Sequence, residues 1–191
     1  MFACQHEGVT PDLMAISKGL TGGYMPLAAT LTTDEIYQAF LGRYADFKTF
    51  FHGHSYTGNP LGCAVALANI EIFQKEKTLA KLQPKIKTMA RLLQPLRQLP
   101  HVGEIRQQGF IVAIELVANK QTKKPYLLEA RIGHKVAMDA RNRGLLLRPI
   151  GNVIVLMPPL STSLPELKRM VEILREAIEA VTLLPAAGAG S

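Results

Sequence analysis

Two short apolar runs near the start of the chain enclose a glycine-rich segment. They cover residues 13–16 and 27–31, with Gly19, Gly22 and Gly23 between them. Short apolar runs bounded by glycine and polar residues are typical of strands, and we expect two buried strands here.

A helix and a long loop are predicted next. Thr32 and Glu35 have the spacing of a capping box, which favours a helix over about residues 33–41. A loop then covers residues 42–58.

Two helices of different character should follow this loop. Asn59 and Pro60 supply a helix cap and a proline at the first helical position, and residues 61–73 are apolar almost all round. That helix should therefore be buried on most faces. Residues 79–99 are basic and amphipathic, which predicts a helix that covers a core. Its apolar positions recur at helical spacing: Leu82, Ile86, Met89, Leu92 and Leu93.

The remainder alternates between strand and helix patterns. Residues 103–109 and 110–116 predict two strands, and a helix over residues 128–142 should end before Gly144. A further strand pair is expected at residues 145–148 and 153–157. Ser163 and Glu166 form a capping box for a last helix that reaches about residue 181.

These patterns suggest two domains and a tail. Residues 1–76 resemble the end of an α/β domain, residues 77–182 a small α+β domain, and residues 183–191 a flexible tail. The first part has two strands at most, too few for a stable parallel sheet. We therefore expect an N-terminal portion of this domain to be missing.

Composition places the chain among globular proteins. Of its 191 residues, 48% are apolar and 19% are charged, and the net charge is +7. The basic residues are spread over helical segments, which favours a solvated helix face over nucleic-acid binding. Neither a signal peptide nor a membrane span is evident, and two distant cysteines indicate a reducing compartment. We expect a cytoplasmic protein with no nucleic-acid or membrane partner.

Lys18 is the first candidate for chemistry. A lysine at the end of a buried strand would be partly desolvated, which favours the neutral amine that forms an imine with a carbonyl. The glycines after it would let a bulky ligand approach the backbone. From these residues alone, an ordinary exposed lysine remains the alternative.

The loop before the predicted helix is the second candidate. It reads HGHSYTGNP over residues 52–60, and its hydroxyls, imidazoles and helix entry suit a phosphate or carboxylate. A simple capped helix entry is the alternative. We discount a metal at His52 and His54, because the other histidines show no ligand-like spacing to them.

Arg148 is the third candidate. It follows an apolar run and precedes Pro149, where its guanidinium could hold a substrate carboxylate with two parallel hydrogen bonds. A surface ion pair with a nearby glutamate is the alternative. An imine-forming lysine, an anion-binding loop and a carboxylate-binding arginine are together what a pyridoxal-phosphate enzyme needs.

Three separated stretches resemble class III aminotransferases, which are fold type I pyridoxal-phosphate enzymes. The first is PDLMAISKGLTGGYMPLAATLTT over residues 11–33, and the second is FHGHSYTGNPL over residues 51–61. The third is LRPIGNVIVLMPP over residues 147–159. The resemblance implies an α/β fold: the C-terminal part of the large domain followed by the small α+β domain.

The same resemblance implies roles for five residues. Lys18 would link the pyridoxal 5'-phosphate covalently, contact the substrate and move a proton at its α-carbon. His54 and Ser55 would hold the cofactor phosphate of the neighbouring subunit, which implies a homodimer with shared active sites. Some relatives have other residues at these two positions, so the His54 side chain is the less secure assignment. Gly53 and Arg148 would contact the substrate.

Within the family, the stretches are most similar to the branch that serves biotin biosynthesis. That branch transfers an amino group from S-adenosylmethionine to 8-amino-7-oxononanoate. The alternatives are a class III enzyme for ornithine, acetylornithine or an ω-amino acid, and a non-catalytic truncated dimerisation module. The family's pyridine-nitrogen aspartate precedes the lysine segment, so we expect this chain alone to be inactive.

Overall fold

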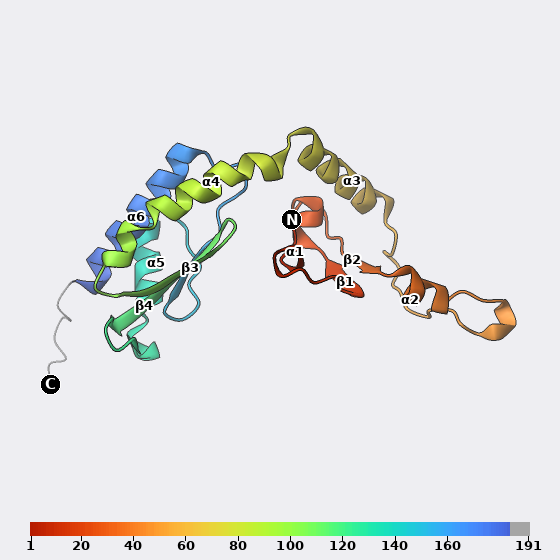
Figure 1. Ribbon diagram of the computed structural model, residues 1–191, viewed down its shortest axis with the longest axis horizontal. Coiled ribbons are helices and arrows are strands. Elements are labelled where there is room, and N and C mark those ends of the chain that lie inside the picture. Colours follow the sequence, from red (N-terminus) through yellow and green to blue (C-terminus); the bar gives the residue numbers. More distant parts are fainter. Residues whose placement is uncertain (184–191) are drawn as a thin grey trace. The chain divides into compact units, whose positions relative to one another are not determined.

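A computed structural model describes residues 1–183 of the chain. The chain forms two compact units, one from Met1 to Leu79 and one from Ala80 onward (Figure 1). Each unit is described by itself. No helix in the described part is long and apolar enough to cross a membrane.

The first unit is built around one short antiparallel ladder. Strand β1 pairs with β2 from Leu13 opposite Thr32 to Ile16 opposite Ala29. Both predicted strands are therefore present. The elements of this unit, in order, are α1 (Cys4–Glu7), β1 (Leu13–Ile16), the 3-10 helix η1 (Lys18–Thr21), β2 (Ala29–Thr32), α2 (Asp34–Ala39), the 3-10 helix η2 (Tyr44–Asp46) and α3 (Pro60–Lys75).

The expectation that these elements are buried is wrong within the described residues. Leu13 on β1 is 61% exposed and Leu31 on β2 is 48% exposed. On α3 only Gly62 and Ala66 are buried. The physical reason is a shortage of partners, because this unit contains one two-stranded ladder and one long helix to cover each other's apolar faces.

Side-chain caps start both longer helices of the first unit. The Thr33 hydroxyl accepts from the backbone N–H of Ile36 at 3.4 Å and begins α2. The predicted helix is present, but the Thr32–Glu35 capping box is wrong because the chain enters the helix one residue later. The Asn59 side chain accepts from Leu61 and begins α3, as predicted.

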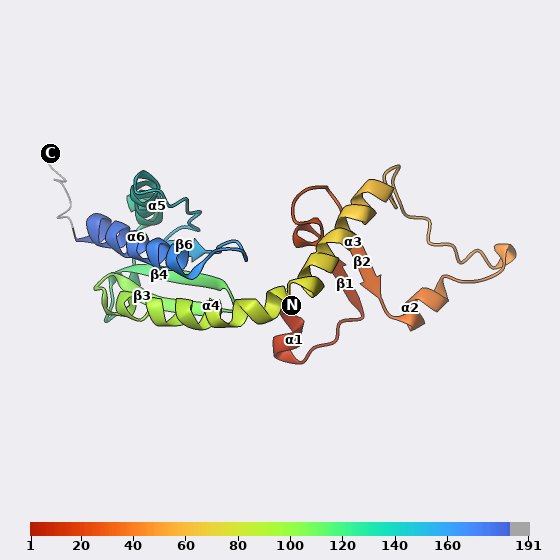
Figure 2. The same ribbon diagram turned by 90° about the horizontal axis from the view of Figure 1, so that it is seen from above.

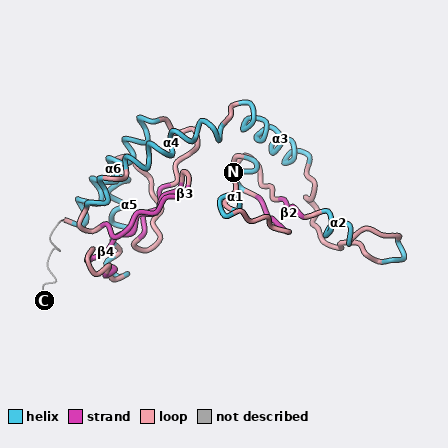
Figure 3. The backbone as a smooth tube through the Cα atoms, viewed as in Figure 1, coloured by secondary structure: helices cyan, strands magenta, loops and turns pink. Residues whose placement is uncertain are grey.

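The second unit has a four-stranded antiparallel sheet centred on β4 (Figure 3). Strand β3 pairs with β4 through residues 102–108, while β6 and β5 pair with successive parts of β4. The elements, in order, are α4 (Thr78–Leu92), the 3-10 helix η3 (Pro95–Gln98), β3 (Val102–Gln108), β4 (Ile111–Asn119), β5 (Lys124–Pro125), the 3-10 helix η4 (Leu128–Ala130), α5 (Ile132–Asn142), β6 (Val153–Leu156) and α6 (Leu164–Thr182).

One hydrophobic core joins this sheet to its helices. Helices α5 and α6 lie side by side, and α4 runs along β3 (Figures 1 and 2). Met89 of α4, Ile114 of β4 and Leu174 of α6 are each completely buried in that core. The amphipathic pattern of α4 therefore predicted its buried face correctly.

Three predictions for the second unit need correction. The helix expected over residues 79–99 ends at Leu92, and Pro95 starts the separate 3-10 helix η3. Residues 145–148 are not a strand, because β6 pairs with β4 instead, and Pro149 has no N–H for a ladder. Helix α5 begins at Ile132, four residues later than expected, after the separate turn η4. The capping box of α6 is confirmed by the pair of hydrogen bonds between Ser163 and Glu166. The predicted mobility of residues 185–191 lies outside the described residues.

Candidate functional site

Lys18 occupies an unusual backbone conformation at the end of β1. It is the first residue of η1, and its φ of 50° lies in the left-handed region that disfavours residues with a Cβ. Such strain is found preferentially at functional sites. The side chain is exposed and makes no hydrogen bond or ion pair to any described residue. The expected desolvation of Lys18 is therefore wrong within this unit.

Two polar side chains brace the turn that Lys18 begins. The Asn69 amide on α3 donates to the carbonyl oxygens of Gly19 at 2.7 Å and Leu20 at 3.1 Å. Thr21 is only 2% exposed, and its hydroxyl donates to the Met25 carbonyl oxygen at 2.6 Å. Sequence reasoning missed both roles. The available signal was Asn69 itself, the first polar side chain after the apolar residues 60–68 of α3.

Two of the glycines that follow Lys18 have open space beside their own backbone. A Cβ added at Gly19 or Gly23 would have no neighbouring atom within 4 Å. Gly23 also has a φ of 85°, which an L side chain rarely adopts. An exposed lysine followed by open glycine positions can accommodate a bulky aromatic aldehyde. The residues present therefore fit pyridoxal phosphate.

The loop before α3 is folded on itself by local hydrogen bonds. The His54 backbone N–H donates to the Thr57 hydroxyl at 3.0 Å, and the Tyr56 N–H donates to His54 Nδ1 at 3.1 Å. An accepting Nδ1 places the ring proton on Nε2, which leaves Nε2–H as a donor. Ser55 is exposed, and its hydroxyl has no partner among the described residues. Both side chains can therefore donate to an anion.

The first turn of α3 is a weaker anion site than its sequence suggested. Asn59 Oδ1 accepts from the Leu61 N–H at 2.9 Å and from the Gly62 N–H at 3.4 Å. These are two of the N–H groups that a phosphate would need at a helix start. An anion at this loop would thus be held by Ser55 and His54 rather than by the helix end.

Arg148 belongs to the second unit and is exposed there. Its guanidinium makes no hydrogen bond or ion pair with the described residues, in contrast to Arg143, which pairs with Asp139 and Glu176. The alternative of a local pair with glutamate is therefore absent from this part of the chain. All the guanidinium donors remain free for a planar anion such as a carboxylate.

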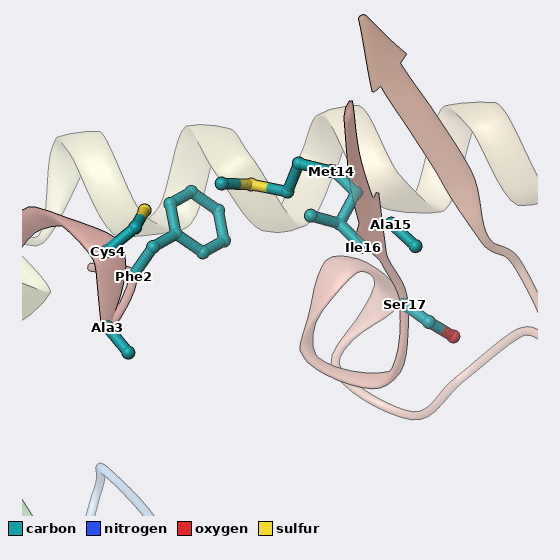
Figure 4. Close-up of a pocket in the computed structure, with 7 residues that line it drawn as sticks. All are labelled: Phe2, Ala3, Cys4, Met14, Ala15, Ile16 and Ser17. Carbon is teal, nitrogen blue, oxygen red and sulfur yellow. The ribbon is translucent and has the colours of Figure 1, made fainter. Parts of the chain in front are cut away.

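An open hollow in the first unit is not lined by Lys18. It has a volume of about 380 Å³ and is lined by the start of α1 and by β1. Figure 4 shows Phe2 and Met14 reaching toward each other across it, while the Ser17 hydroxyl points away. The Ser17 hydroxyl instead donates to the Leu27 carbonyl at 3.2 Å. The hollow is an apolar surface feature, separate from the candidate site.

No group of three histidine, cysteine or acidic side chains within residues 1–183 could hold a metal ion. His52 and His54 therefore lack a third ligand in this part of the chain. The chemistry available to the site is that of an amine, hydroxyl and imidazole donors, and a guanidinium.

Known proteins are similar to this chain over nearly its whole length. The sequence profile of the family described as "Aminotransferase class-III" matches residues 1–178. The chain belongs to the class III aminotransferase family. The recognition of this family from its three motifs is thereby confirmed.

Individual relatives point to one branch of the family. An adenosylmethionine-8-amino-7-oxononanoate aminotransferase from Nitratidesulfovibrio vulgaris is 57% identical over 182 residues, which are 95% of this chain and 34% of that protein. The crystal structure of the enzyme of that name from Methanocaldococcus jannaschii has a TM-score of 0.90 at 49% identity, over 95% of this chain and 42% of that one. The expected α/β class is confirmed by this likeness.

The similarity extends to more distant aminotransferases. A PMP-bound aminotransferase from Vibrio fluvialis has a TM-score of 0.89 at 28% identity, covering 96% of this chain and 40% of that one. The chain thus spans about two fifths of the relatives that it matches, and the activity of a whole enzyme is a separate question.

Proposed function

We propose that this chain supplies the cofactor-linking lysine and the substrate-binding arginine of a pyridoxal-phosphate aminotransferase. The proposal rests on Lys18. Its backbone is strained, its amine is exposed and has no partner among the described residues, and open glycine positions follow it. Residues in this sparsely populated backbone region cluster at active sites, although Phe47, Lys77, Lys123 and Arg131 also have a positive φ in this chain. The reaction is amino transfer from S-adenosylmethionine to 8-amino-7-oxononanoate, as the names of the close relatives suggest.

In this proposal the residues have different tasks. Pyridoxal phosphate, when bound, supplies the electron sink that makes the substrate α-proton acidic. Lys18 holds the cofactor covalently between turnovers, and its freed amine then moves the proton at the α-carbon as general base and acid. Gly53 lets the substrate approach the loop backbone, and Arg148 binds the substrate carboxylate.

His54 and Ser55 act on the cofactor phosphate of a second copy. Their free donors and exposure support this role, since the groups that they would bind lie outside their own loop. The complete enzyme is accordingly a homodimer with shared active sites. We place it in the cytoplasm, which agrees with two cysteines that are both free thiols.

The surroundings of Arg148 favour a long aliphatic substrate over ornithine. Leu146 is 79% exposed and Ile150 is 71% exposed on either side of the arginine. A carboxylate on a hydrocarbon chain would find a cation and apolar surface together there, whereas ornithine would bring a second ammonium group to the same place.

The experiment is a chimaera in which this chain replaces the matching segment of the Methanocaldococcus jannaschii enzyme. We expect visible absorbance from bound pyridoxal phosphate and transamination of 8-amino-7-oxononanoate with S-adenosylmethionine. Lys18→Ala should abolish both, and the matched control Lys87→Ala, on an exposed face of α4, should abolish neither.

The outcomes separate the three hypotheses. Turnover with ornithine or an ω-amino acid instead of S-adenosylmethionine would move the chain to another branch of the family. A folded, dimeric chimaera that shows no lysine-dependent absorbance would favour the non-catalytic module.

The same chimaera bears on the domain division. We propose that residues 1–76 complete a cofactor-binding large domain and that residues 77–182 form the small domain beside it. Support comes from the placement of Lys18 in the first unit and of Arg148 in the second.

A further inference from the structure

The segment before Arg148 is fixed by the core of the second unit. Leu145 is buried, Leu147 packs against the hydrophobic core, and Leu146 and Arg148 are exposed. This alternation holds the backbone on one side and leaves the guanidinium on the other. Arg148 therefore follows an anchored stretch of chain although it is in no strand.

The segment after Arg148 is fixed by the start of α5. Gly133 is the second residue of this helix, and a Cβ added there would lie well under 3.0 Å from the Gly151 carbonyl oxygen, closer than real Cβ atoms come. It would also lie 3.3 Å from Pro149 Cβ. The obstacle is backbone rather than a flexible side-chain tip. Any side chain at position 133 must therefore displace the turn of residues 149–152.

Asn152 ties the same turn to a second neighbour. Its side-chain amide donates to the Tyr126 carbonyl at 2.8 Å, and its own carbonyl accepts from the Leu116 N–H at 2.9 Å. Within the turn, the Ile150 N–H donates to the Val153 carbonyl at 2.8 Å. The turn is thus held by α5, by β4 and by the loop at Tyr126.

We propose that Gly133 and Asn152 are positioning residues for Arg148. Two parallel hydrogen bonds to a carboxylate need the guanidinium plane in one orientation, and small displacements of a binding group cost much of its effect. Gly133 admits the turn close to α5, and Asn152 prevents it from moving away. This inference rests on the proposed function, in which Arg148 binds the substrate carboxylate.

The positional part can be tested on the 191-residue chain without cofactor or substrate. We expect Gly133→Ala to shift the backbone amide resonances of residues 147–152 and the Arg148 Nε–H resonance in proton–nitrogen correlation spectra. Asn152→Ala should shift the same set without adding bulk. The control is Gly109→Ala, in the turn between β3 and β4, where the φ of 57° also strains an alanine but a Cβ would have no neighbouring atom within 4 Å.

The functional part is tested in the chimaera. Gly133→Ala should raise the KM for 8-amino-7-oxononanoate by about 10- to 100-fold, the range that loss of a charge-assisted hydrogen bond gives, with the cofactor absorbance unchanged. Because Gly133 acts through Arg148, the double variant with Arg148→Ala should be no worse than Arg148→Ala alone. Gly109→Ala should leave the KM within about threefold of the parent.

Two results would overturn the inference. One is unshifted resonances at residues 147–152 in both Gly133→Ala and Asn152→Ala, and the other is a KM effect that adds fully to that of Arg148→Ala. If Gly133→Ala does not fold, Asn152→Ala decides both points. A parent chimaera that binds cofactor but does not transaminate 8-amino-7-oxononanoate would reject the proposed substrate. The spectra would still decide the positioning of Arg148.

Discussion

The side-chain amide of Asn69 donates a hydrogen bond to the carbonyl oxygen of Gly19 at 2.7 Å, between residues that are 50 positions apart. Asn69 lies on α3, and Gly19 directly follows Lys18. This bond, with its companion to Leu20, joins the helix to the strained turn that presents the lysine. The conformation of Lys18 thus depends on a helix that begins more than forty residues later.

Replacing Asn69 should weaken cofactor binding through Lys18. Asn69→Ala leaves the Gly19 and Leu20 carbonyls without these donors, and each bond contributes about 0.5–1.5 kcal/mol. We expect about a tenfold lower affinity of the chimaera for pyridoxal phosphate, measured by absorbance titration. Gln74→Ala, at an exposed position of the same helix, is the matched control and should bind as the parent does. Equal affinities for both variants would show that the turn stands without Asn69.

The left-handed backbone of Lys18 predicts a trade between stability and function. Lys18→Gly should make the chain more stable than Lys18→Ala by about 1 kcal/mol, because only glycine adopts a φ of 50° without strain. Both variants lose the reactive amine. Denaturant unfolding of the two chains measures the difference.

A helical lysine serves as the control for this comparison. At Lys87, an exposed position of α4, glycine should be less stable than alanine by about 1 kcal/mol, which is the opposite sign. A Lys18→Gly chain that is no more stable than Lys18→Ala would mean that the turn is not strained in solution.

Tyr126 predicts a pH dependence of stability in the alkaline range. Burial raises the pKa of Tyr126 above its ordinary value, and its hydroxyl lies 2.6 Å from His101 Nδ1. A raised pKa in the folded state means that the unfolded chain loses this proton first. The contribution of Tyr126 is therefore complete below a pH of about 10 and is lost as the pH rises above it.

The comparison with Tyr126→Phe isolates this effect from the titration of the lysines. At neutral pH the variant should be less stable by about 1 kcal/mol, the usual net value of a hydrogen bond. This deficit should shrink when unfolding is measured above a pH of about 10. A deficit that stays constant up to pH values well beyond that point would contradict the assignment.

Local signals predicted the elements whose causes lie within a few residues. The α6 capping box and the Asn59 cap of α3 were read correctly because donor and acceptor are neighbours in sequence. Residues 145–148 were wrongly predicted to be a strand that pairs with β6. An apolar run does not reveal its partner, and β6 pairs with β4 instead. The burial of α3 was misread for a related reason, since an apolar helix shows what needs covering but not what covers it.

The candidate site divides in the same way. Lys18, Ser55 and Arg148 were found from short motifs and their resemblance to a family. Asn69 donates to the Gly19 and Leu20 carbonyls, which lie about fifty residues earlier in the chain, and Gly133 lies against the Gly151 carbonyl. No periodicity or motif marks such contacts, so they became visible only when the structure placed the partners together.

The second unit should fold without the first. Its core residues, from Leu82 to Ile178, all come from the part of the chain that starts at α4, and the core cluster includes no side chain from residues 1–77. We expect a polypeptide of residues 77–183 to show cooperative unfolding and dispersed amide resonances.

Leu174→Ala, which empties a completely buried position of α6, should lower the free energy of unfolding of this polypeptide by about 2–5 kcal/mol. The same substitution at Leu183, which is 56% exposed, should change it by less than about 0.5 kcal/mol. Unfolding without a cooperative transition would instead make the core of this unit dependent on residues outside it.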